Sequence, residues 1–373
     1  MGIQDIFVAK SKHRVWERLA DDHVIGAGSG AAIKNDDGYF VVRLSEMYIR
    51  HSRKLWRRIH PMLHGFTEYA GNEHHAVIGP AQLQEISETN LDRIMNFNYR
   101  ICGPVPYFGG DVDVLAGLYS VPGEDAGKAL IDTVSTVAGL ASVAADPVFK
   151  ITEAVRTGVE RIISIDQAAL RIGVRDTFFP GAQNPLRSGF HVAIDAARPE
   201  VDFQRLWLVD GRLLTGTHPE AAVPYSDTDY LVLQIERRAS RQDWPRLPVM
   251  ADYNKKFSAI IASSALTWEK KKEELSRIWP EFTEAVAQSR DLISRDKLQI
   301  RVSVQTDLRE RMKPAKEAAE GLVFESRGWG GYDRKDMRVG EFDFADVADQ
   351  IDFTDPASLA AGERIAARPL FAE

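Results

Sequence analysis

The segment GEDAGKA, residues 123–129, contains the residue types of a phosphate-binding loop. Backbone amides and a lysine surround phosphates when such a loop joins a strand to a helix. Only three residues separate Gly123 from Gly127, and Ala129 stands where a hydroxyl would hold magnesium. Two acidic side chains inside the loop also repel phosphate. We therefore predict no bound cofactor, and a nucleotide-binding enzyme that uses the loop from Gly123 to Lys128 stays as an alternative.

A second glycine cluster, Gly26, Gly28 and Gly30 followed by Ala31, has the spacing of a dinucleotide fingerprint. That fingerprint needs a helix directly afterwards, so that the helix N-terminus faces the pyrophosphate. A hairpin signal, Asn-Asp-Asp-Gly at residues 35–38, follows instead. We predict a glycine-rich turn or bulge.

Histidines and carboxylates gather between residues 51 and 75. Imidazole and carboxylate ligands suit zinc, but Pro61 disfavours the helix that would place His60 beside His64. We predict surface and partly buried histidines rather than a metal centre, and the sequence leaves open metal binding by His60, His64, His74 and His75. The pairs Asp111, Asp113 and Asp227, Asp229 have oxygen ligands for magnesium, but we expect them to mark strand edges and turns.

A dense group of cations is the most distinctive surface feature. Its five members, Arg50, Arg53, Lys54, Arg57 and Arg58, follow the spacing i, i+3, i+4, i+7, i+8. On a helix over residues 43–59 they would share one face. Five like charges on one stripe repel each other, and an anionic partner would relieve that repulsion. We predict a partner-binding surface here.

The C-terminal residues 339–373 are acidic, with eight Asp or Glu and two Arg. Asp343, Asp346, Asp349 and Asp352 recur every third residue between aromatic and aliphatic side chains. Such a segment suits a basic, partly apolar groove. We predict that it binds a partner, and our hypothesis is that it covers the basic stripe of its own or a neighbouring chain.

Composition places the 373-residue chain among ordinary globular proteins, with 44% hydrophobic and 27% charged residues. The formal net charge of -7 repels nucleic acid and anionic membrane on average, so either partner requires a local basic patch. Cys102 is the single cysteine, which excludes internal disulfides and thiolate-rich metal sites. We expect a soluble, cytoplasmic protein, because no secretory signal is visible and the apolar run 129–145 is shorter than a membrane span.

Hydrophobic periodicity and turn residues predict a mixture of helices and strands. We expect helices over residues 8–20, 43–59, 81–97, 123–165, 252–265, 268–278 and 281–294, with Pro280 at a helix start. Strands are expected within 24–43 and over 99–105, 112–121, 190–194, 203–209, 230–235 and 298–304. The fold class is α/β, with α+β as the alternative.

These segments predict two sheet-containing domains joined by a helical connector. The expected parts are an N-terminal α/β domain 1–122, the connector 123–170, a C-terminal α/β domain 171–315 and an acidic tail 316–373. Every catalytic template fails on spacing or context, so we expect a non-enzymatic protein that works by protein binding, self-association or complex assembly. Nucleic acid and a membrane-active role stay open as alternatives.

Overall fold

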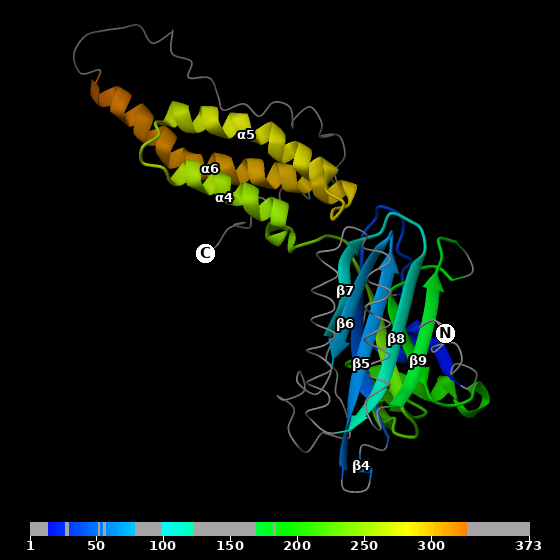
Figure 1. Cartoon of the computed structure of the whole chain (residues 1–373). Helices are drawn as coiled ribbons and strands as arrows, with labels where there is room; N and C mark the ends of the chain where they lie inside the picture. The colour runs from blue at the N-terminus through cyan, green and yellow to red at the C-terminus, as the bar shows by residue number, and fades with distance from the viewer. Residues whose placement is uncertain are drawn as a thin grey trace. The chain divides into compact units, whose positions relative to one another are not determined.

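Strands and long helices occupy different parts of the chain (Figure 1). The computed structural model describes residues 14–26, 30–50, 53–54, 57–78, 99–122, 169–181 and 184–326. The chain divides into two units, Met1–Ala239 and Ser240–Glu373. Within the described residues all strands lie in the first unit and all three α-helices in the second. The mixed class predicted from the sequence is confirmed, in the segregated arrangement of an α+β protein.

A five-stranded antiparallel sheet forms the centre of the first unit. Its order is β1 (Val15–Arg18), β10 (Gly189–Ile194), β14 (Tyr230–Arg238), β3 (Tyr39–Tyr48) and β7 (Tyr99–Pro106). Nearly every residue of β3 is buried. A strand covered on both faces has a continuous apolar sequence instead of an alternating one, which accounts for the run Tyr-Phe-Val-Val at its start.

Two further sheets belong to the same unit. One has the order β4 (Arg53–Lys54), β5 (Arg57–Tyr69), β8 (Val112–Pro122) and β9 (Ala169–Phe178), with β6 (Asn72–Ile78) also paired to β5. The small sheet has the order β13 (Val223–Pro224), β12 (Arg212–Thr215), β11 (Leu206–Val209) and β2 (Val24–Ile25). Short 3-10 helices η2 (Asp21–His23), η5 (Arg198–Glu200), η6 (Phe203–Arg205) and η7 (Pro219–Ala221) lie in the connections.

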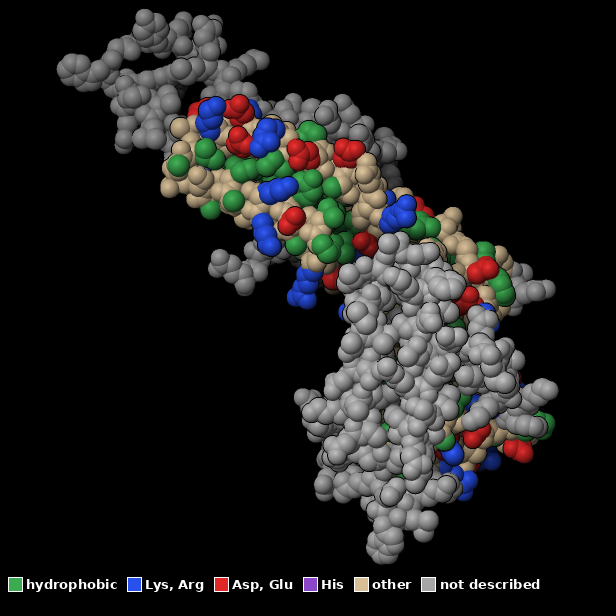
Figure 2. All heavy atoms as spheres, viewed as in Figure 1, with side chains coloured by type: hydrophobic (Ala, Val, Ile, Leu, Met, Phe, Trp, Pro, Cys, Tyr) green, Lys and Arg blue, Asp and Glu red, His purple; other side chains and the backbone are tan. Residues whose placement is uncertain are grey.

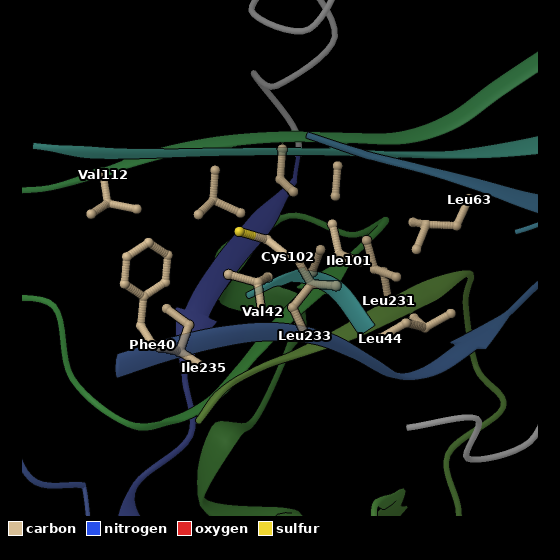
Figure 3. Packing of buried hydrophobic residues seen from close by; sticks show 14 of the residues in the cluster. Phe40, Val42, Leu44, Leu63, Ile101, Cys102, Val112, Leu231, Leu233 and Ile235 are labelled. Atoms are coloured by element: carbon tan, nitrogen blue, oxygen red, sulfur yellow. The ribbon is translucent and has the colours of Figure 1, made fainter. Parts of the chain in front are cut away.

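The central sheet has an apolar core on each face. On one face Phe40, Val42 and Leu44 pack with residues of β5, β8 and β9, and buried Cys102 lies among them (Figure 3). On the other face Val192 and Val232 pack against residues of the small sheet. The central sheet is thus the middle layer of three.

The second unit is a bundle of three helices, α4 (Pro248–Ala262), α5 (Trp268–Gln288) and α6 (Ser294–Ser326), preceded by η8 (Trp244–Arg246). Residues Leu275, Phe282 and Val286 recur at helical spacing and are buried in its core. Aromatic rings of α4 and α5 meet edge to face, with 5.4 Å between the ring centroids of Phe257 and Phe282. Acidic and basic side chains are interspersed on the visible face of the bundle (Figure 2).

Several predicted strands are confirmed, namely those over 99–105, 112–121, 190–194 and 230–235. The expected strand over 203–209 begins later, at Leu206, because η6 occupies its start. A turn forms at residues 35–37, where Asp36 has a φ of 55°, but the next strand, β3, pairs with β14 and β7 and not with the described residues 24–26 and 30–34.

Three predicted elements are wrong, and one predicted helix start is misplaced. The expected helix 43–59 is replaced by parts of β3, β4 and β5, and residues 15–18 of the expected helix 8–20 form β1. The expected strand 298–304 lies inside α6, where Ile300, Val304 and Leu308 share the face that packs into the bundle core. Pro280 lies inside α5, so 268–278 and the first part of 281–294 form one helix.

Strand pairing crosses the domain boundaries that the sequence predicts. β8 pairs with β9, and β3 pairs with β14, so residues on both sides of 123–170 share sheets. The division falls instead between Ala239 and Ser240. Residues 316–326 of the expected tail belong to α6, while 327–373 and the expected helices 81–97 and 123–165 lie outside the described residues. No helix in the described part of the chain is long and apolar enough to cross a membrane.

Candidate partner-binding site

The basic segment is a β-hairpin and not a helix. Arg53 pairs with Arg58 and Lys54 with Arg57, so the prediction of a single helical face is wrong. The physical reason is long-range pairing, because β5 continues from the hairpin into a ladder with β8 that runs from Ile59 to Tyr69. This long-range pairing determines the backbone conformation, whatever helical spacing the cations have in the local sequence.

The basic hairpin, defined here as β4 and the first two residues of β5, extends past the end of the sheet. The last pair between β5 and β8 joins Ile59 to Pro122. Within the described residues Arg57 and Arg58 pair only with β4. A strand rises about 3.3 Å per residue, so Arg57 lies about 7 Å past Ile59 along β5. In the described part of the chain the backbone of four cationic residues therefore lies beyond the last pair of β5 with β8.

The same end of the sheet receives a long connection. β8 ends at Pro122 and β9 begins at Ala169, the partner of Ser120, so residues 123–168 leave and return here. By contrast, β14 ends at Arg238, opposite Tyr39, at the other end of the central sheet. The basic hairpin and the two ends of the connection 123–168 therefore meet the sheet at the same end.

Asp229 holds the segment between β3 and the basic hairpin at Arg50. Its Oδ1 accepts the backbone N–H of Arg50 at 2.8 Å, and its Oδ2 accepts Arg171 Nε at 2.6 Å. The Asp229 side chain is 2% exposed and that of Arg171 is 36% exposed. Since Asp229 directly precedes β14 and Arg171 belongs to β9, one carboxylate connects the chain after β3 to two sheets.

Aromatic rings pack together at the end of β3. Tyr48, at the end of β3, stacks on Tyr230 with 5.3 Å between ring centroids, and Tyr225 meets Tyr230 edge to face at 5.6 Å. Burial raises the pKa of the Tyr225 phenol, so it stays protonated at neutral pH. The end of β3 thus lies in a packed, neutral aromatic group.

Asp229→Ala is expected to lower the free energy of unfolding by about 2 kcal/mol. The substitution leaves Arg171 and the Arg50 N–H without their acceptor, and the partial exposure of Arg171 keeps the loss below that of a fully buried pair. Urea unfolding of the full chain measures it. Asp227→Ala, at an exposed position two residues away, is the control and should change stability by less than about 0.5 kcal/mol. Equal losses in the two variants would contradict the anchoring role.

The other predicted site residues are not brought into this arrangement. Arg50 is exposed, and its structural contact is through its backbone. Asp343, Asp346, Asp349 and Asp352 lie outside the described residues, as do Gly123 to Lys128. Gly26 has a φ of 85° after β2, and the turn at residues 35–37 and β3 follow, where a dinucleotide fingerprint requires a helix.

The residues considered as metal ligands are not grouped in the described part of the chain, and two of the carboxylates accept hydrogen bonds from other residues. Within the described residues no three His, Cys, Asp or Glu side chains are grouped as metal ligands. His64 is buried, and desolvation lowers its pKa to about 4. Asp113 accepts a hydrogen bond from Thr177 Oγ1 at 2.5 Å, and Asp229 is held as described above. His51 and the side chains of His60 and His75 lie outside the described part.

Cys102 is not available as a nucleophile. Burial raises the pKa of its thiol to about 12, so the reactive thiolate does not form at neutral pH. It serves as an apolar core residue between the sheets.

A buried polar cluster around His191 was not visible in the sequence. The Trp16 ring stacks on His191 at 5.2 Å, and Trp16 Nε1 donates to Asp176 Oδ2 at 2.9 Å. Asn184 Nδ2 donates to the other oxygen of Asp176 at 3.0 Å. Burial raises the pKa of Asp176 and lowers that of His191 to about 3. The cluster connects β1, β9 and β10, strands whose pairing the sequence does not reveal.

Asp229 and Arg171 were also missed as parts of one site. A carboxylate placed directly before an apolar strand was the only available signal, and it resembles an ordinary turn. Comparison with protein-family models, curated proteins and solved structures finds no match for this chain. Function is therefore inferred from the residues and their geometry.

Proposed function

We propose that this protein is a non-enzymatic binding protein, which acts through macromolecular contacts made by the basic hairpin. The observation that carries the proposal is the backbone register of Arg53, Lys54, Arg57 and Arg58 on an extension beyond the last pair of β5 with β8. An enzyme needs converging reactive groups, whereas a docking site needs a complementary surface on a firm support.

The register supports a binding role because it places like charges opposite each other, which lowers the stability of the isolated hairpin. Arg53 lies opposite Arg58, and Lys54 lies opposite Arg57. Like charges at directly opposite positions of an antiparallel pair cost about 0.2 to 1 kcal/mol relative to neutral pairs. An anionic partner removes this repulsion on binding, so the free energy lost in the isolated chain is recovered in the complex.

The firm hold on the chain before the hairpin is the second reason. Asp229 connects the backbone of Arg50 to Arg171, and Tyr48 of β3 stacks on Tyr230. A segment that is held in place before binding loses less conformational entropy on binding. The partner classes that fit are an acidic protein surface, a second copy of the chain through an acidic segment, or another polyanionic surface.

The test compares two alanine variants of the full chain. The hairpin variant replaces Arg53, Lys54, Arg57 and Arg58. The scattered-cation control replaces Arg205, Lys255, Arg290 and Arg309, four exposed residues with the same balance of Arg and Lys. A fluorescent heparin octasaccharide is the polyanionic probe. We expect at least about a tenfold weaker affinity for the hairpin variant, which is about 1.4 kcal/mol, and little change for the control.

Wild-type affinity in the hairpin variant would contradict the proposal, as would an equal loss in the control. Circular dichroism of each variant checks that the fold is retained. Because the hairpin lies beyond the ladder of β5 with β8, removal of its charges should leave the sheet intact.

A further inference from the structure

A β-bulge places two arginines opposite each other on the central sheet. Val42 of β3 pairs with Cys102 of β7. The next residue of β3, Arg43, pairs with Arg100, which leaves Ile101 as an extra residue in β7. In a regular ladder Arg100 would lie opposite the residue after Arg43, a leucine buried in the core between the sheets. The bulge therefore moves the Arg100 side chain out of that core and beside Arg43.

Both arginines point to the face of the central sheet that is turned away from β5 and β8. Successive side chains of a strand alternate between the two faces of a sheet. Val42 and Leu44 are buried in the core that contains residues of β5, β8 and β9, so Arg43 between them points the other way. Residues directly opposite in an antiparallel pair share a face, with about 5 Å between their Cβ atoms. The two guanidinium groups can therefore reach a common ligand atom group.

A carboxylate beside the pair is already shared by two cations. Glu236 of β14 accepts hydrogen bonds from Arg43 Nε and Arg238 Nε, each at 2.8 Å. Burial favours the neutral acid, but these two arginines outweigh it and lower the pKa of Glu236, so the carboxylate is ionised at neutral pH. Arg100 is exposed and forms no hydrogen bond or ion pair with the residues that the structure describes. It adds a further positive charge to the group.

The opposed pair lowers the stability of the protein without a ligand. Like charges directly opposite in an antiparallel pair are destabilising. The Arg43 side chain is only 16% exposed, so water screens its charge less than that of a surface residue. Gln234 of β14 is paired with Arg43 on its other side, which adds an amide donor in the same row across three strands. A guanidinium group can donate two parallel hydrogen bonds to a phosphate or carboxylate, and such a group would remove the repulsion.

We propose that Arg43 and Arg100 form a binding site for one oxyanion group of a ligand, a phosphate or a carboxylate. Arg100 is the exposed cation that the ligand meets first, and Arg43 is held in place by Glu236. Both residues belong to strands of the central sheet, so the site is formed before the ligand binds. The site is separate from the basic hairpin, and the inference does not depend on the proposed function.

Isothermal titration calorimetry of the full chain tests the site. The probes are inorganic phosphate and succinate at constant ionic strength, and we expect saturable binding of at least one. Tighter binding of phosphate would identify a phosphate ligand, and tighter binding of succinate a carboxylate ligand. Arg100→Gln should weaken binding at least about tenfold, because it removes one of the two guanidinium groups. Arg205→Gln, the same substitution at another exposed arginine, is the control and should bind like wild type.

Thermal unfolding gives a second readout that a merely structural role of Arg100 would not produce. In chloride buffer Arg100→Gln should melt no lower than wild type, because the substitution removes the opposed like charges. Saturating phosphate or succinate should raise the melting temperature of wild type more than that of Arg100→Gln. Phosphate also stabilises proteins in general by exclusion from their surface, so an equal rise in both proteins would count against the site.

The inference is overturned if neither probe binds saturably, or if Arg100→Gln binds as tightly as wild type. The hairpin variant defined above should retain binding of the small anion. If the hairpin variant loses that binding and Arg100→Gln retains it, the anion binds at the hairpin. That result would overturn the site at Arg43 and Arg100 and leave the proposed function standing.

Discussion

Gly103→Ala is expected to destabilise the first unit by about 3 kcal/mol, the sum of a strained backbone and a steric clash. Gly103 lies in β7 with a φ of 95°, a backbone angle that residues other than glycine rarely adopt. An added Cβ would collide with the carbonyl oxygen of Phe40 and lie 3.1 Å from the Cα of Val41. Both atoms belong to the backbone of Phe40 and Val41, which are fully buried in β3, so a shift of either atom would disturb the core.

Hydrogen exchange of the β3 and β7 amides, measured by mass spectrometry on the full chain, reports this loss. A change of 3 kcal/mol corresponds to roughly a 150-fold faster exchange of amides that open only by unfolding. Gly71→Ala is the matched control. Gly71 has a φ of 74° but no atom within 4 Å of an added Cβ, so only the strain of about 1 kcal/mol applies. Equal effects at the two glycines would show that β7 and β3 are not packed as described.

Acidification from pH 7 to pH 4.5 is expected to remove about 4 kcal/mol of stability from the first unit. Burial lowers the pKa of His64 to about 4 and that of His191 to about 3. The unfolded chain therefore binds protons that the folded chain excludes. Stability is complete above the ordinary histidine pKa of about 6.5 and falls as the pH drops toward the folded values, by about 2.5 kcal/mol per histidine at pH 4.5.

Nearby groups modify this prediction in known directions. Arg18 adds to the low pKa of His191, which increases the acid sensitivity. Asp176 acts in the opposite direction, because its raised pKa means that the folded state gains a proton before the unfolded state does. The net loss is therefore somewhat below the sum for the two histidines.

Urea midpoints between pH 7.5 and 4.5 measure the effect, and His191→Phe tests its origin. Phenylalanine keeps the ring between Trp16 and Phe178 but cannot be protonated, so about half of the pH dependence should disappear. His218→Gln, at an exposed position, should leave the pH profile unchanged. An unaltered profile in His191→Phe would contradict the assignment.

The sequence predicted the strands whose own composition defines them. Tyr99 to Val105 and Tyr230 to Ile235 are rich in aromatic and branched residues between turn signals, and both form strands. The region 43–59 failed because its residues fit a helical period equally well, and only the distant partners β14 and β8 determine that it is extended. Likewise, the apolar residues of 298–304 suit a strand or a helix until the bundle core is known.

The sequence suggested the residues of the candidate site but not their arrangement. The cluster of five cations, Arg53 and Lys54 among them, is evident from the sequence alone, and its binding role stays a prediction. Arg53 pairs with Arg58 and Lys54 with Arg57 in a hairpin that the sequence alone does not predict. The contacts of Asp229 join residues 58 and 179 positions apart in the chain, and no local pattern records such contacts.

The central claim is that the four cations of the basic hairpin make the contact with an anionic partner. Its most direct test is the slope of log affinity against log salt concentration for the heparin octasaccharide, because that slope counts the cations that displace counterions. We predict a steep slope for wild type and the scattered-cation control, and a slope flatter by about three to four units for the hairpin variant. Equal slopes for wild type and the hairpin variant would show that other residues make the contact with the anionic partner.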